Sequence, residues 1–145
     1  MALVDFIPVD GQKRIAQAIT EAEKRTSGEI CVHVTPRCRF SPIWKAKRKF
    51  NKLHLYKTLR RNAVLIFIAY KSQKFAIIGD TGINEAVPKG FWDQEKETLA
   101  ASLANGRQVD GLCEIIARIG ESLSTYFPAD REDLNEISNE ITYED

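Results

Sequence analysis

The eight residues from Ala63 to Tyr70 constrain the fold most, because every one of them is apolar. A strand that is apolar on both sides is covered on both faces, as central strands of α/β sheets are. The segment is too short to cross a membrane, which takes roughly 20 apolar residues in a helix. We therefore expect a buried central strand inside an α/β core.

Two neighbouring segments complete a small mixed sheet. Residues 29–35 alternate between apolar and other side chains, which predicts a strand rich in β-branched residues. A helix beginning at Ser41-Pro42 separates this strand from the central one, so the two strands should run parallel in a right-handed β-α-β unit. After a turn at residues 71–73, residues 74–79 should return as the antiparallel strand of a hairpin.

Helical periodicity predicts the remaining elements. Asp10 should cap a helix that runs to about Arg25, a short turn should cover 83–87, and helices should span 90–104 and 109–126. In the helix that starts at Ser41-Pro42 we expect one packed stripe, formed by Ile43, Trp44, Lys47, Phe50 and Leu53. A chain of 145 residues suits one domain.

This topology brings three polar segments to one edge of the sheet: residues 26–29, 61–62 and 79–82. They contain Glu29, Asn62, Asp80 and Thr81, and Asp93 on the next helix could add another carboxylate. Hard oxygen donors of this kind bind Ca²⁺, or alternatively Mg²⁺. The competing interpretation is structural, with Asp80 capping the next helix and Glu29 paired with Arg61.

The same segments resemble the TPM domain family. The resemblance rests on Thr26-Ser27-Gly28-Glu29-Ile30, residues 61–66, residues 76–83, Trp92 and Tyr126-Phe127-Pro128, in that order. It implies a three-layer α/β/α sandwich and one domain over residues 1–128, while the acidic composition of residues 129–145 indicates a tail. It also implies divalent-metal binding, with calcium prominent, near Glu29, Asn62, Asp80 and Thr81 and less directly Asp93.

The leading functional expectation is a calcium-binding interaction or regulatory module that works through a protein partner not identified by the sequence. An alternative is a low-activity, metal-dependent acid phosphatase, as some plant members of the family are, with Arg60 or Arg61 holding the phosphate. The chain has no Cys-x₅-Arg loop and no Asp-x-Asp pair, so such a reaction would need the metal to activate water.

Charge is divided unevenly along the chain. Ten basic residues and no acidic residue lie between Arg37 and Arg61, whereas residues 129–145 contain seven acidic residues and one arginine. A further alternative is therefore that the basic 37–61 segment binds an anion or a nucleic acid, or that the acidic tail folds over it. The predicted burial of Trp44 and Phe50 argues against nucleic acid, because few rings remain to stack on bases.

The start of the chain shows neither a signal peptide nor a membrane anchor, since its first residues lack a basic start followed by a long apolar run. Many family members are exported or membrane-anchored, and this chain departs from them in that respect. We therefore expect a cytoplasmic protein.

Overall fold

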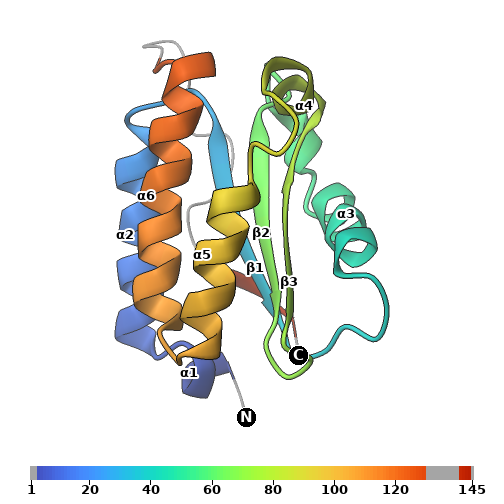
Figure 1. Cartoon of the computed structure of the whole chain (residues 1–145), viewed down its shortest axis with the longest axis vertical. Coiled ribbons are helices and arrows are strands. Elements are labelled where there is room, and N and C mark those ends of the chain that lie inside the picture. The colour runs from blue at the N-terminus through green and yellow to red at the C-terminus, as the bar shows by residue number, and fades with distance from the viewer. Residues whose placement is uncertain (1–2, 130–140, 145) are drawn as a thin grey trace.

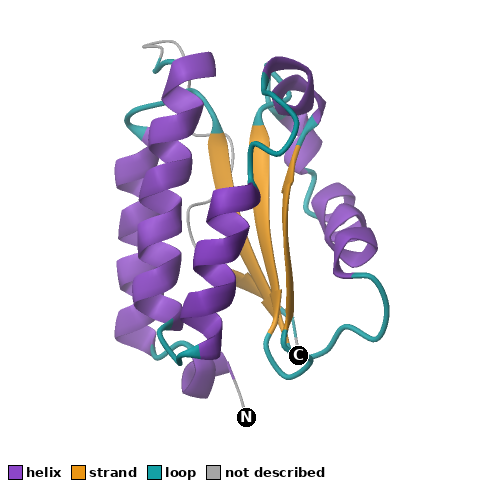
Figure 2. Ribbon diagram, viewed as in Figure 1, coloured by secondary structure: helices purple, strands orange, loops and turns teal. Residues whose placement is uncertain are grey.

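The computed structural model describes residues 3–129 and 141–144. At its centre is a mixed sheet with the strand order β3-β2-β1-β4, covered by helices on both faces (Figures 1 and 2). The strands are β1 (Glu29–Thr35), β2 (Ala63–Ala69), β3 (Lys74–Gly79) and β4 (Thr142–Tyr143). The predicted three-layer α/β/α architecture is confirmed.

The two faces of the sheet carry different numbers of helices. Helices α2 (Val9–Glu23), α5 (Asp93–Ala104) and α6 (Gln108–Tyr126) cover one face, and α3 (Pro42–Lys52) covers the other (Figure 1). The short helices in the described ranges are α1 (Leu3–Phe6), which precedes α2, the 3₁₀ helix η1 (Leu55–Lys57), which follows α3, and α4 (Thr81–Ala86), which follows β3. None of the helices in the described ranges combines the length and apolar character needed to cross a membrane.

Strand pairing follows the predicted topology. β1 and β2 are parallel, with Glu29 opposite Ala63, and β2 and β3 form the antiparallel hairpin. The sequence did not predict β4, which pairs parallel to β1 at the open edge of the sheet. Residues 130–140 and 145 of the predicted acidic tail lie outside the described residues.

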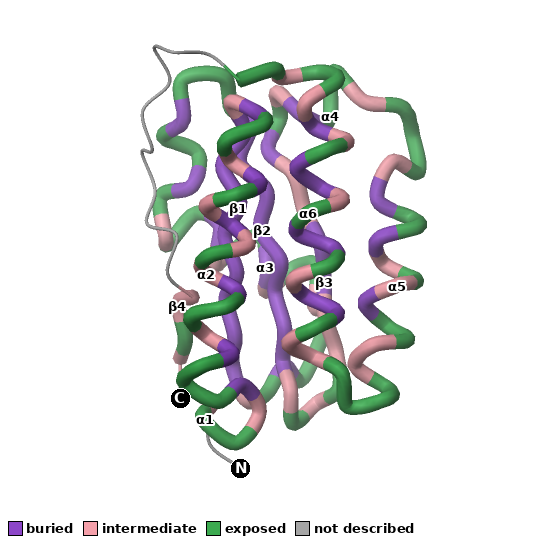
Figure 3. Tube along the Cα trace, turned by 90° about the vertical axis from the view of Figure 1, so that its left-hand side faces the viewer, coloured by how far each residue is buried: buried purple, intermediate pink, exposed green. Residues whose placement is uncertain are grey.

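Two apolar cores lie on the two faces of the sheet. All seven residues of β2 are buried, as predicted for a central strand (Figure 3). Ile66 faces the core formed with α2 and α6, whereas Phe67 faces the smaller core formed with Phe50 of α3. The alternation of these two neighbours shows why the strand must be apolar at every position.

Asp10 does not cap the first long helix. That helix already begins at Val9, and Pro8 is its N-terminal cap residue, with φ −58° and no side-chain capping bond. A proline suits this place because its fixed φ is compatible with the helix and its missing N–H would have had no partner. Asp10 instead lies in the first turn, where a negative charge is favoured by the helix dipole.

The predicted packed stripe of α3 is wrong in orientation. Ala46 and Phe50 are buried, but Ile43 is 50% exposed and Trp44 is 55% exposed. Successive helical residues are about 100° apart, so a stripe centred on Ala46 instead of Lys47 turns the helix enough to bring Trp44 to the surface. The small alanine allows α3 to approach the sheet closely. The predicted stripe did not include Ala46, because it was based on larger side chains.

Candidate functional site

The three polar segments do meet at one edge of the sheet, which we call the Asp80 edge: residues 26–29, 61–62 and 79–82. The pairing of Glu29 with Ala63, and the hydrogen bond from the Asp80 N–H to the Ala63 carbonyl at 2.9 Å, place the three in one row. This edge lies at the top of the sheet in Figure 1, next to α4.

Asp80 is the most constrained side chain of this edge. It follows the last residue of β3 and is 6% exposed. Its Oδ1 accepts a hydrogen bond from the Thr81 N–H at 2.7 Å, which caps the N-terminus of α4. Capping by Asp80, the structural interpretation of this turn, is therefore confirmed.

Arg61 binds the same carboxylate through both of its oxygens. Its Nε lies 2.7 Å from Oδ2 and its Nη2 lies 2.8 Å from Oδ1, an arrangement that matches the planar guanidinium to the planar carboxylate. The hydrogen bond to Asp80 raises the pKa of Arg61. Arg61 has a left-handed backbone with φ +51°, which turns the chain just before β2.

Gly82 shows how closely the chain is packed at this edge. Its N–H donates to the Arg61 carbonyl at 2.9 Å, and a Cβ at Gly82 would overlap the carbonyl oxygens of both Arg60 and Arg61. Asp80, two residues earlier, therefore begins a turn that packs against two backbone carbonyls, one of which already accepts the Gly82 N–H. These are hard oxygen donors of the kind that Ca²⁺ uses.

The other predicted ligands differ in their positions. Asn62 is 1% exposed and its Nδ2 donates to Ser27 Oγ at 3.2 Å, so it joins the first two segments of the edge. Glu29 is buried on β1, two strands from Asp80, a separation of about 9–10 Å between backbones. Thr81 is exposed beside Asp80.

Asp93 is an exposed residue at the start of α5. Within residues 3–129 and 141–144, no three His, Cys, Asp or Glu side chains are grouped so that they could hold a metal ion. Glu29, Asp80 and Asp93 therefore do not form a three-carboxylate site. Any cation at this edge would depend on fewer than three such carboxylates together with neutral oxygens.

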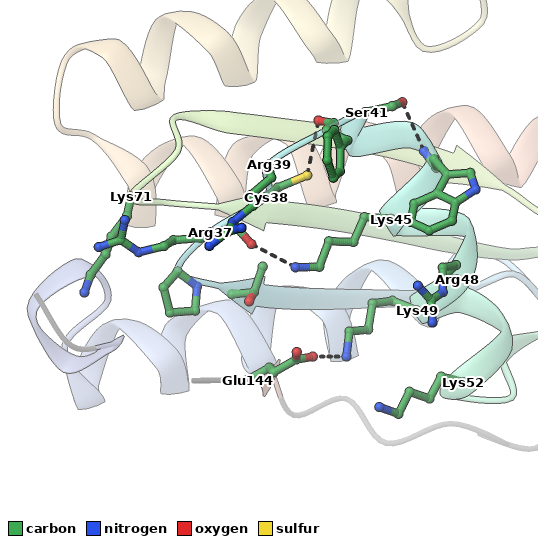
Figure 4. Close-up of a pocket in the computed structure, with 14 residues that line it drawn as sticks. Arg37, Cys38, Arg39, Ser41, Lys45, Arg48, Lys49, Lys52, Lys71 and Glu144 are labelled. Atoms are coloured by element: carbon green, nitrogen blue, oxygen red, sulfur yellow. Dashed lines mark hydrogen bonds and ion pairs between the residues drawn. The ribbon is translucent and has the colours of Figure 1, made fainter.

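A second polar region lies at the opposite end of β1. A cavity of about 960 Å³ opens between the 36–41 connection, α3 and Glu144, and we call it the α3 pocket (Figure 4). Of its fourteen lining residues, seven are lysine or arginine. The sequence indicated the basic run but not the pocket, because β4, which places Glu144 there, has no sequence signal of its own.

Comparisons with known proteins agree with the fold. The protein BA42 from the psychrophilic bacterium Bizionia argentinensis has a solution structure that matches this chain with a TM-score of 0.87 and 35% sequence identity, over 93% of each chain. The N-terminal domain of the cg2496 protein from Corynebacterium glutamicum matches with a TM-score of 0.62 and 12% identity, over 87% of this chain and 78% of that one. The second likeness concerns the fold alone.

A search of proteins with curated descriptions finds no significant match. The family model of the TPM domain, by contrast, matches residues 3–122, which include β1, β2, β3 and every segment of the Asp80 edge. This chain belongs to the TPM domain family.

Proposed function

We propose that this chain is a divalent-cation-binding TPM domain that acts as an interaction or regulatory module, with Ca²⁺ bound at the Asp80 edge. The observation that carries the proposal is the buried Asp80 carboxylate, held on a turn that packs against the Arg60 and Arg61 carbonyls. Thr81 and Asn62 border the same turn and would supply further oxygens. When bound, the cation would link the turn before β2 to the turn after β3.

Arg61 would be the competitor of the cation. Its guanidinium already occupies both Asp80 oxygens, and its side chain is 49% exposed, so it can move into water without leaving a buried charge. A site with one carboxylate should bind Ca²⁺ weakly, with a dissociation constant of about 10⁻⁴–10⁻³ M. Glu29 and Asp93 stay predictions as ligands, because among the described residues they do not form a three-carboxylate group with Asp80.

The test is a Ca²⁺ titration of the melting temperature and of the backbone amide shifts at constant ionic strength. For a dissociation constant of about 1 mM, 10 mM Ca²⁺ should stabilise the native state by about 1.4 kcal/mol. Asp80→Asn should abolish this effect. Arg61→Asn, which removes the competing charge and tolerates a positive φ, should lower the dissociation constant.

Asp110→Asn is the matched control. Asp110 also pairs with an arginine, Arg14 at 2.8 Å, but it lies on α6, away from the Asp80 edge. It should respond to Ca²⁺ like the wild type. An absence of any Ca²⁺ response at 10 mM, or an unchanged response in Asp80→Asn, would remove the proposal.

The phosphatase alternative has no comparable support. In the structure the Arg61 guanidinium, which would hold a phosphate, is engaged by Asp80. Hydrolysis of p-nitrophenyl phosphate by the wild type, lost in Asp80→Asn but not in Asp110→Asn, would favour it over a purely regulatory role.

A further inference from the structure

The α3 pocket lies beyond the carboxyl end of β1, at the opposite end of the sheet from the Asp80 edge. In open α/β sheets, ligands bind in crevices outside the carboxyl ends of parallel strands. The α3 pocket has about 960 Å³ of space, near the upper end of the range for small-molecule sites. Its place in the fold and its size therefore suit a ligand.

Positive charge dominates the pocket wall. The side chains converge from three segments: the 36–41 connection, α3 and Lys71 of the β2–β3 hairpin (Figure 4). The Lys49 side chain is only 11% exposed, and its pKa is lowered by burial and then by the charges of Lys52, Lys45 and Arg48. Cations that repel one another in this way are stabilised by any anion placed among them.

Among the described residues that line the pocket, only Glu144 is acidic, and its carboxylate pairs with Lys49. The segment that carries it is held by the two-residue strand β4 and by a hydrogen bond from the Glu144 N–H to the Val34 carbonyl at 3.0 Å. So short a strand offers few bonds to break. A ligand with more negative charge than one carboxylate can therefore compete with Glu144 for the lysines.

His33 lies beneath the position of the Glu144 carboxylate without lining the pocket. The residue is 3% exposed, and its Nδ1 lies 2.7 Å from the Thr142 hydroxyl, which itself donates to the Val32 carbonyl. The hydroxyl must then accept from Nδ1–H, which leaves the Nε2 lone pair facing Glu144 at 3.8 Å. Nε2 has no hydrogen-bond partner among the described residues, and as an unprotonated acceptor it adds no attraction for an anion.

Two exposed aromatic rings line the α3 pocket, and we call this solvent-facing part of the pocket its mouth. Trp44 is 55% exposed and Phe40 is 78% exposed, and both line the pocket. The Arg48 guanidinium lies 4.9 Å from the centre of the Trp44 ring, so charge and ring form one surface. Such a surface suits a ligand that joins phosphates to an aromatic base.

We propose that the α3 pocket binds a nucleoside polyphosphate, and that the Glu144 carboxylate takes the place of one phosphate in the free protein. The phosphates would lie among Lys45, Lys49 and Lys52, and the base would stack at the mouth near Trp44. A cavity of this size falls in the range of small-molecule sites, which favours a small nucleotide over an extended nucleic acid. The proposal is independent of any cation at the Asp80 edge.

The test is a titration with ATP, AMP and inorganic tripolyphosphate at 150 mM salt with EDTA, followed by tryptophan fluorescence and amide shifts. ATP should bind more tightly than AMP or tripolyphosphate, with shifts centred on α3 and residues 142–144. Lys49→Gln and Lys52→Gln should each weaken binding by about 10-fold, the cost of about 1.4 kcal/mol for one lost charged contact. Glu144→Gln should tighten binding severalfold.

Two controls separate this site from general charge effects. Lys47→Gln removes the same charge from the exposed side of α3, and Lys47 does not line the pocket. The Lys47→Gln variant should therefore bind ATP as tightly as the wild type. Asp80→Asn should also bind ATP normally. Lys52 is exposed, so its variant tests the pocket without disturbing the core.

Three results would overturn the proposal. They are no ATP binding at millimolar concentration, equal weakening by Lys47→Gln and Lys52→Gln, and binding of a single-stranded oligonucleotide but not of ATP. Tripolyphosphate binding as tight as ATP would reject the stacked base and leave an inorganic polyphosphate as the ligand class.

Discussion

Replacing Asp80 should separate its structural role from any role in binding. Its carboxylate caps α4 through the Thr81 N–H and accepts two hydrogen bonds from Arg61, with only 6% of the residue exposed. Loss of an Asp cap costs about 0.5–2 kcal/mol, and a hydrogen bond to a charged group contributes about 1.5–3 kcal/mol. Because Arg61 can return to water, Asp80→Ala should destabilise the protein by about 2–3 kcal/mol in total.

Asp80→Asn is the informative partner of Asp80→Ala. The asparagine Oδ1 can still accept from the Thr81 N–H, so the cap is kept while the charged pair with Arg61 is lost. We expect Asp80→Asn to lower the free energy of unfolding by about half as much as Asp80→Ala does. A loss of 2–3 kcal/mol corresponds to roughly 7–10 °C in melting temperature for a chain of this size.

Urea unfolding at pH 7 without divalent ions measures both variants, and Asp110→Ala provides the comparison on an exposed ion pair. Surface pairs contribute little, so that variant should stay near the wild type. An Asp80→Ala protein that unfolds within about 0.5 kcal/mol of the wild type would refute the view that this carboxylate organises the edge. Equal losses in Asp80→Ala and Asp80→Asn would instead refute the separate contribution of the cap.

Three further predictions concern the rest of the fold. Burial, and then the charges of nearby lysines, lowers the pKa of His33 to about 4, so between pH 6.5 and pH 4 the unfolded chain binds a proton that the folded chain does not bind. The free energy of unfolding should therefore fall by about 3 kcal/mol from pH 6.5 to pH 4. Urea unfolding of His33→Gln should show a smaller fall. Gly120→Val places a Cβ 2.8 Å from that of Ala22 and should cost about 1–3 kcal/mol by thermal unfolding. Burial raises the pKa of Cys31 to about 12, so a thiol reagent should label half-exposed Cys113 long before Cys31, as mass spectrometry can show; equal labelling would contradict this.

The parts of the fold that the sequence predicted are those with strong periodic or topological signals. The apolar run of β2 required cover on both faces, and the helix between β1 and β2 required parallel strands. Once these two facts were given, Glu29, Asn62 and Asp80 had to reach the same edge. Family resemblance and strand topology therefore pointed to one place by different routes.

Side-chain partners at that edge could not be predicted in the same way. Whether Arg61 pairs with Glu29 or with Asp80 depends on the left-handed turn at Arg61, which brings its side chain toward β3. Arginine has no particular preference for a left-handed backbone, so the residue type at this position does not predict the turn. The metal-ligand assignments stay predictions for the same reason, since they depend on where single side chains point.

The α3 pocket was hidden by two errors of the same kind. A helical stripe read from apolar residues alone placed Trp44 inside, whereas Ala46 marks the true packed face and leaves the ring in solvent. The acidic tail carries too few apolar residues to suggest a strand, yet the backbone of residues 142–144 pairs with β1 and sets Glu144 against Lys49. In both cases the deciding contact is made by backbone or by a small side chain. Because Trp44 is exposed, its ring is free to stack on a base. Basic residues of this segment also line a pocket, so they form a site and not only a charged surface.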